Sequence, residues 1–162
     1  MTRKATGKVE RTARGKDVII TRSFRASIED VWESVTASQS TARWIGSWRG
    51  EPGPGKTIQF KMLFEEGDHE SPALIERCEP PRHLALAIKG DSEGDWHLEL
   101  TLRQRGDTTE LTFVHHLTGD QSPSSIGPGW EYYLDRLVAA RTGEAMPVFE
   151  EYYPAQKEHY ES

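Results

Sequence analysis

The strongest constraint on the fold is an alternation of apolar and polar side chains that runs from residue 56 to residue 117. In the stretch "DWHLELTLRQRG" every second side chain is apolar, namely those of Trp96, Leu98, Leu100 and Leu102. Because successive side chains of a strand point to opposite faces, this pattern predicts a strand with one buried face. Turn residues divide the region into five such stretches. The sequence therefore predicts an antiparallel meander with one apolar face and one face in water.

Helical patterns flank this meander on both sides. Residues 17–25, "DVIITRSFR", predict a further strand, and Ser27 is a suitable N-cap for a short helix after it. A second short helix is expected to end at Gly46, and a long helix with an apolar stripe is expected from Trp130 to a stop at Gly143. This order predicts an α+β domain. Its six-stranded antiparallel sheet wraps around a long C-terminal helix, and two short helices lie between strands 1 and 2.

Two tryptophans of the short helices, Trp32 and Trp44, are too large for such small elements to bury alone. We expect them to plug one end of the groove between the sheet and the long helix. Residues 17–162 are expected to form this single domain, preceded by a basic, flexible N-terminal segment at residues 1–16.

Charge is distributed unevenly over the 162 residues, whose net charge is −6. Residues 1–16 hold six Lys or Arg and one acid, Glu10, so the remainder carries 14 basic and 25 acidic residues. A negative body repels phosphate backbones, and we expect no nucleic-acid partner. No run approaches the ~20 apolar residues of a membrane span, so no membrane association is expected. The single cysteine, Cys78, is typical of a reducing compartment, and we expect a cytoplasmic protein.

Five short patterns follow one another along the chain: "SIEDVWESVT" (27–36), "FKM" (60–62), "EPPRHL" (79–84), "TELTFVH" (109–115) and "GWEYYLDRL" (129–137). With these patterns the chain resembles the activator of heat shock protein 90 ATPase homologue-like family. That family lies within the START/SRPBCC (birch-pollen-allergen-like) superfamily and has the helix-grip fold. One departure is "ALIER", which places Glu76 where the family has an aliphatic residue. The superfamily includes lipid and hormone binders, aromatic cyclases and a co-chaperone domain, so the resemblance implies a fold more firmly than a function.

The groove between sheet and helix is the expected binding site for an apolar or aromatic small molecule. Nine residues are its candidate ligand-binding residues: Trp44, Trp48, Phe60, Met62, Leu100, Phe113, His115, Trp130 and Tyr133. His115 is the polar exception, since it shares parity with Leu111 and Phe113 and is expected to point inward. An imidazole on an apolar wall would supply a polar handle or a proton-transfer group, although a core histidine bonded to a neighbour is the simpler interpretation.

We assign no catalytic residue, no metal ligand and no cofactor. His115 and His116 are adjacent on a strand and point to opposite faces, so they cannot hold one ion together. No histidine pair has the i, i+4 spacing of a helical zinc site. Small-molecule binding is the first functional hypothesis. A co-chaperone-like module that stimulates a heat-shock ATPase is the alternative, and a cyclase-type enzyme using His115 is the second.

Two further features of the sequence, a charged side chain in a strand and an aromatic C-terminal stretch, require contacts with other residues or with another molecule. Arg22 shares the parity of Ile20 and Phe24, and we expect it at the rim of the sheet, because a buried guanidinium would need a carboxylate or an anionic ligand. The C-terminal stretch "FEEYYPAQKEHY" (149–160) combines charge with five aromatic side chains. We expect it to pack on its own domain or on a second copy, with a homodimer favoured.

Overall fold

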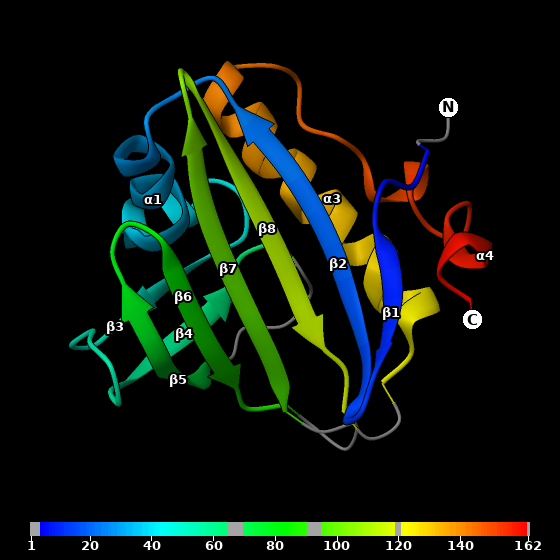
Figure 1. Ribbon diagram of the computed structural model, residues 1–162, viewed down its shortest axis with the longest axis horizontal. Coiled ribbons are helices and arrows are strands. Elements are labelled where there is room, and N and C mark those ends of the chain that lie inside the picture. The colour runs from blue at the N-terminus through cyan, green and yellow to red at the C-terminus, as the bar shows by residue number, and fades with distance from the viewer. Residues whose placement is uncertain (1–3, 65–69, 91–94, 119–120, 162) are drawn as a thin grey trace.

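The computed structural model of the chain describes residues 4–64, 70–90, 95–118 and 121–161. An eight-stranded antiparallel sheet, in the order β1-β2-β8-β7-β6-β5-β4-β3, lies against one long helix (Figure 1). The strands are β1 (Lys8–Thr12), β2 (Gly15–Phe24), β3 (Gly46–Arg49), β4 (Thr57–Met62), β5 (Ser71–Glu79), β6 (His83–Ile88), β7 (Trp96–Arg105) and β8 (Thr108–His116). The helices are α1 (Ile28–Thr36), α2 (Ser38–Thr41), α3 (Pro123–Thr142) and α4 (Lys157–Tyr160), with a 3-10 turn, η1 (Phe149–Glu151). The predicted helix-grip fold is confirmed.

The register of the sheet follows the apolar alternation. In β7 and β8, Leu98 pairs with His115 and Leu100 pairs with Phe113, so one face collects the apolar side chains. That face packs on α3, where Leu134 and Leu137 are fully buried. The other face carries the intervening polar side chains, and none of the described helices covers it (Figure 1).

The expected number of six strands is wrong, because two short strands extend the sheet to eight. Lys8–Thr12, which we expected to lie in a flexible segment, pairs with β2 from Lys8↔Ile19 to Thr12↔Gly15. This pairing covers the backbone groups that β2 would otherwise leave open at the edge. At the opposite edge Gly46–Arg49 pairs with β4, so Gly46 begins a strand. The expected end of the second short helix at Gly46 is wrong, because α2 already ends at Thr41.

Helix ends agree with the expected capping residues at Ser27 and Gly143, but not at the end of α2 or at the start of α3. The Ser27 side chain accepts a hydrogen bond from the Asp30 N–H (3.2 Å), as expected of an N-cap. Gly143, with φ of 78°, ends α3 in the left-handed conformation that glycine favours. However, α3 begins at Pro123, because proline is well tolerated in the first turn of a helix. The stretch "SPSSIGPG" is therefore mostly helical and not a run of turns.

A β-bulge explains how the unusual Glu76 is accommodated. The register between β5 and β6 shifts between Ile75 and Arg77. Before the bulge Ala73 and Ile75 are buried, and after it Cys78 takes the inward position, so Glu76 and Arg77 both face outward.

On the side of α3 that faces β1 and β2, a buried carboxylate holds both ends of the chain. Glu131 is 1% exposed and accepts hydrogen bonds from the backbone N–H groups of Thr6 (2.7 Å) and Gly7 (3.2 Å). The Tyr160 hydroxyl and Arg22 (3.2 Å) donate to the same carboxylate. Burial would raise the pKa of Glu131, but these hydrogen bonds, led by those from Thr6 and Tyr160, hold it below its usual range.

Arg22 is therefore not at the rim, as we expected, but ion-paired inside. Its side chain is 12% exposed and also contacts Asp135 at 2.9 Å. Tyr152 and Tyr160 are fully buried against their own domain, so the aromatic C-terminal stretch packs within the chain. The homodimer stays a prediction.

Candidate functional site

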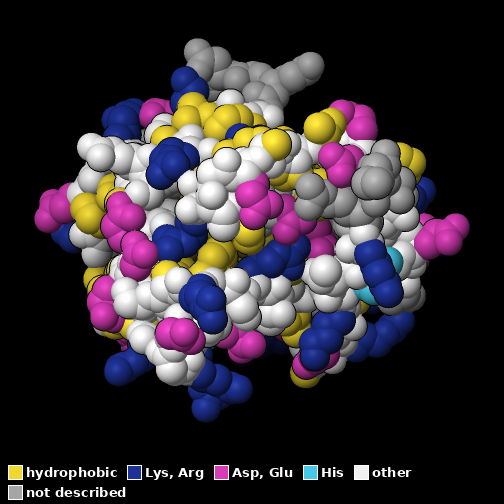
Figure 2. All heavy atoms as spheres, turned by 90° about the horizontal axis from the view of Figure 1, so that it is seen from above, with side chains coloured by type: hydrophobic (Ala, Val, Ile, Leu, Met, Phe, Trp, Pro, Cys, Tyr) yellow, Lys and Arg dark blue, Asp and Glu magenta, His cyan; other side chains and the backbone are white. Residues whose placement is uncertain are grey.

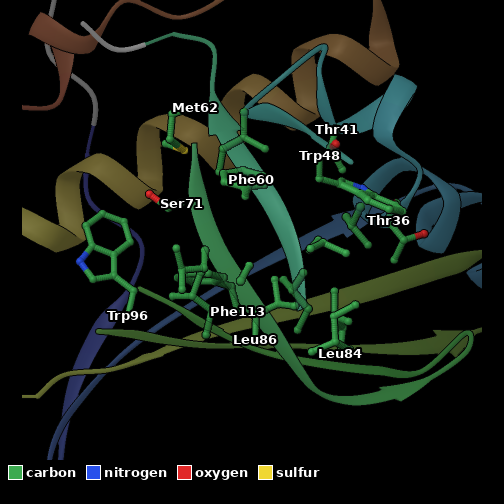
Figure 3. Close-up of a pocket in the computed structure, with 18 of the residues that line it drawn as sticks. Thr36, Thr41, Trp48, Phe60, Met62, Ser71, Leu84, Leu86, Trp96 and Phe113 are labelled. Carbon is green, nitrogen blue, oxygen red and sulfur yellow. The ribbon is translucent and has the colours of Figure 1, made fainter. Parts of the chain in front are cut away.

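A cavity of about 720 Å³ lies between the sheet and α3. It is bounded by α1 and α2 at one end, by the inner face of β3 to β8, and by α3 (Figure 3). Its wall includes Trp32, Val35, Thr36, Thr41, Trp44, Ile45, Trp48, Ile58, Phe60, Met62, Ser71, Ala73, Ile75, Cys78, Leu84, Leu86, Ile88, Trp96, Leu98, Leu100, Phe113, Trp130 and Leu134. The volume lies within the range of small-molecule sites, ~300–1,000 Å³.

All five tryptophans of the sequence line this cavity. Three of them use their indole N–H inside the protein. Trp44 donates to the Ser34 carbonyl (3.0 Å) and Trp48 to the Thr36 carbonyl (2.8 Å). Trp130 donates to Nδ1 of His115 (3.0 Å). These bonds fix the ring planes and leave apolar ring surface toward the cavity.

A few polar groups interrupt the apolar wall at its two ends. Figure 3 places Ser71 and Trp96 at one end and Thr36, Thr41 and Trp48 at the other. The Thr36 hydroxyl donates to the Trp32 carbonyl at 2.6 Å, which leaves its oxygen able to accept a hydrogen bond from a ligand. This arrangement can orient an apolar molecule, because a few hydrogen-bonding groups on an apolar wall provide specificity.

Cys78 also lies on the wall and is half-buried. Burial raises the pKa of the Cys78 thiol, so the thiol stays protonated at neutral pH. Because the thiolate is the nucleophile, this cysteine is an apolar wall residue rather than a reactive one.

The structure brings seven of the nine candidate residues onto one cavity wall, and their contact with a ligand stays a prediction. His115 and Tyr133 do not line it. Tyr133 is buried against Trp130, with ring centroids 6.1 Å apart. Residues that we did not single out, such as Trp96 and Ala73, complete the wall. The parity of Trp96 with Leu98 was a signal that could have identified it.

His115 points inward as expected but lies behind two tryptophans. It is fully buried, and its ring is 5.3 Å from that of Trp96. Burial lowers the pKa of His115 to about 4, against an opposing interaction with the Gln121 side chain. The ring is therefore neutral, and Nδ1 is the nitrogen that accepts the Trp130 N–H. His115 supports the wall from outside the cavity.

The polar face of the sheet carries a separate ionic cluster. Glu99 accepts from Nε2 of both His83 (2.7 Å) and His116 (2.6 Å), and Asp17 contacts Nδ1 of His116 (2.8 Å). Burial would raise the pKa of Glu99, but the hydrogen bonds from His116 and His83 lower it. Within the described residues, no group of three His, Cys, Asp or Glu side chains is arranged to hold a metal ion.

The outer surface mixes charges of both signs. Figure 2 shows Lys and Arg beside Asp and Glu over one face, and hydrophobic side chains at the bottom of a central recess. None of the described helices is long and apolar enough to cross a membrane.

Comparison with known proteins adds the family. The model of the family described as "Activator of Hsp90 ATPase homolog 1-like protein" matches residues 25–141. No protein with a curated description matches the chain significantly.

Several solved structures share the fold. CalU16 from Micromonospora echinospora is 26% identical with a TM-score of 0.77, and the match covers 97% of this chain and 94% of that one. The protein encoded by gene BPP1335 from Bordetella parapertussis is 23% identical with a TM-score of 0.74, covering 99% and 94%. DynU16, a protein of the dynemicin biosynthetic locus, is 22% identical with a TM-score of 0.69. That match covers 82% of this chain and 50% of DynU16.

The family match spans most of the chain, from the end of β2 to the last turns of α3, and includes the elements that enclose the cavity. This chain belongs to the Activator of Hsp90 ATPase homolog 1-like protein family.

Proposed function

We propose that this protein binds an apolar or aromatic small molecule in the cavity between the sheet and α3. The observation that carries the proposal is a cavity of about 720 Å³ whose wall includes all five tryptophans. Protein interiors are close-packed, with few voids larger than a water molecule. Such a space is therefore not explained by the stability of the fold alone, and a ligand would provide the missing contacts.

The neutral probe N-phenyl-1-naphthylamine tests this proposal, because energy transfer from tryptophan reports binding near the indoles. Saturable binding with one site per chain is expected. Ala73→Phe should abolish it, since Ala73 is 1% exposed and lines the cavity. Leu74→Phe is the matched control, because Leu74 is 38% exposed and does not line the cavity. Binding that survives Ala73→Phe unchanged would reject the proposal.

A second candidate is a protein-interaction module that acts on a heat-shock ATPase. The family description favours it, as does the polar sheet face, which is left uncovered by every helix that the structure describes. It is tested by measuring ATP hydrolysis of the chaperone with and without this protein, where no stimulation would reject it. A cyclase-type enzyme is not proposed, because His115, its expected acid or base, does not line the cavity.

A further inference from the structure

One of the cavity tryptophans is held by a side chain whose hydrogen-bonding state can change. The indole N–H groups of Trp44 and Trp48 donate to backbone carbonyls, which accept at any pH. Trp130, which lines the cavity and is 5% exposed, instead donates to Nδ1 of the fully buried His115 (3.0 Å). The position of the Trp130 ring therefore depends on a nitrogen that has to stay unprotonated.

This hydrogen bond defines the state of the His115 ring. An indole N–H can only donate, so its partner has to be an acceptor. A neutral imidazole has one acceptor and one donor, and accepting at Nδ1 places its proton on Nε2. A proton on Nδ1 would turn the acceptor into a donor and set two N–H groups against each other. The bond to Trp130 therefore exists only while His115 is neutral.

The surroundings of this imidazole keep it neutral. Burial is the main reason that the pKa of its ring is lowered to about 4, and the charges of His116 on β8 and His97 on β7 lower it further. The side chain of Gln121 acts in the opposite direction. The neighbours that β2 and α3 place beside the ring, Val18 and Trp130, carry no charge. At neutral pH the acceptor nitrogen is therefore present.

The ring that His115 holds belongs to a larger aromatic surface of the cavity wall. Phe113 packs on Trp130 with ring centroids 4.4 Å apart, and Trp96 packs on it at 5.8 Å. All three rings line the cavity, and His115 contacts two of them from behind. Without its acceptor the Trp130 N–H would be a buried donor with no partner, which is costly, so the ring would turn. The aromatic surface would then change shape.

We propose that His115 is a positioning residue for the cavity ligand. By accepting the Trp130 N–H it fixes the aromatic surface on which the ligand packs, and the site binds only while His115 is neutral. A ring that is already held in its bound orientation loses less freedom when a ligand binds, which strengthens binding without any contact between His115 and the ligand. The inference rests on the proposed function and adds the residue that regulates its site.

Substitutions that differ in one acceptor test the inference, with N-phenyl-1-naphthylamine as the probe. His115→Asn keeps an oxygen acceptor near the place of Nδ1, whereas His115→Leu keeps none. We expect His115→Leu to bind the probe about tenfold more weakly, as the loss of one hydrogen bond allows, and His115→Asn to stay within about twofold of the wild-type protein. His97→Leu, on the opposite face of the neighbouring strand β7, is the matched control and should leave the affinity unchanged. Equal affinities of the wild-type protein and His115→Leu would overturn the inference.

A double-mutant cycle shows whether the effect passes through the indole. Trp130→Phe removes the N–H and keeps an aromatic ring on the wall. In this background His115→Leu and His115→Asn should bind the probe within about twofold of each other, because no indole N–H is left to accept. A difference that persists without the indole N–H would mean that His115 acts by packing alone, and the inference would be wrong.

The wild-type protein supplies a test that needs no substitution. In a nitrogen–proton NMR titration the Trp130 indole signal should shift together with the protonation of His115, at a pH of about 4, and the affinity for the uncharged probe should fall over the same range. The other indole signals show that the protein is still folded. A Trp130 signal that stays constant while His115 titrates would overturn the inference, even where His115→Leu does not fold.

The outcomes separate this inference from the proposed function. If the wild-type protein does not bind the probe at neutral pH, the proposed function fails and the inference falls with it. Probe binding that is the same with and without an acceptor at residue 115 rejects the inference alone.

Discussion

Helix α3 borders tightly packed protein on one side and a cavity on another. Toward β1 and β2, Glu131 and Asp135 pair with Arg22, and Tyr160 closes over them with no exposed surface. Toward the inner face of the sheet, Trp130 and Leu134 line a space of about 720 Å³. The same helix therefore has a side where polar groups are paired within the chain and a side where apolar residues line a cavity. The first side stabilises the fold, and the second is available to a ligand.

Removing a single side-chain group on the packed side of α3 should lower the free energy of unfolding far more than a substitution on the cavity side. Glu131→Ala removes a carboxylate that accepts hydrogen bonds from Thr6, Gly7 and Tyr160 and pairs with Arg22. Leaving their donors buried without an acceptor is expected to lower the free energy of unfolding by about 3–5 kcal/mol, measured in urea. Glu131→Gln, which keeps the shape, should lose less. A loss below about 1 kcal/mol for Glu131→Ala would show that this network does not hold the fold together.

The buried histidine behind the cavity wall links stability to pH. The pKa of His115 is about 4 in the folded protein and about 6.5 in an exposed chain. Between these values the unfolded chain binds a proton that the folded protein does not, so the free energy of unfolding should fall as pH drops from about 6.5 to about 4. The expected loss is about 3 kcal/mol, at ~1.4 kcal/mol per pH unit. His115→Gln does not titrate and should show a shallower dependence, whereas equal slopes would mean that His115 is solvated.

Alanine substitutions at two glycines of α3 distinguish the effect of side-chain packing on stability from the effect of helix propensity. A Cβ at Gly127 would lie 2.5 Å from the Tyr160 ring, whereas a Cβ at Gly129 meets nothing within 4 Å. Gly127→Ala should therefore displace Tyr160 and destabilise the protein by about 1–3 kcal/mol. Gly129→Ala should stabilise it by about 0.5–1 kcal/mol, because alanine favours the helix. Thermal unfolding of both variants measures the difference, and a stabilising Gly127→Ala would mean that α4 is loosely held.

The smallest expected effect comes from one substitution made in the two environments. Ala139→Leu adds atoms at a buried position away from the cavity wall and should cost about 1–2 kcal/mol. Ala73→Leu adds the same atoms where the cavity has room, so the change should stay below about 1 kcal/mol. Chemical denaturation compares them. Equal costs would show that the space beside Ala73 is already filled.

The inner face of the sheet was predictable because alternation is a local property. The parity of Phe113 and Leu100 placed both on the wall, and Ser27 and Gly143 marked helix ends. The edge strand Lys8–Thr12 was not predicted, because its basic residues are typical of a flexible N-terminal segment. It forms a strand through its pairing with β2, which the local sequence does not indicate.

Contacts between elements that are distant in the sequence could not be predicted from the strand alternation. Arg22 was expected at the rim, but its carboxylate partners are more than 100 residues away along the chain. His115 has the inward parity, yet Trp96 and Trp130 separate it from the cavity. The position of a residue in the strand alternation shows which face of the sheet its side chain lies on. The packing of neighbouring side chains determines whether it borders the cavity.

The most direct test of the central claim, a ligand cavity walled by tryptophan, is a nitrogen–proton NMR spectrum of the five indole N–H groups. Each signal can be assigned by a Trp→Phe variant, and N-phenyl-1-naphthylamine is then titrated into the protein. Because all five tryptophans line one cavity, their signals should change together along a single saturation curve. Indole signals that stay unchanged over the titration would contradict the account, whether the probe binds elsewhere or does not bind.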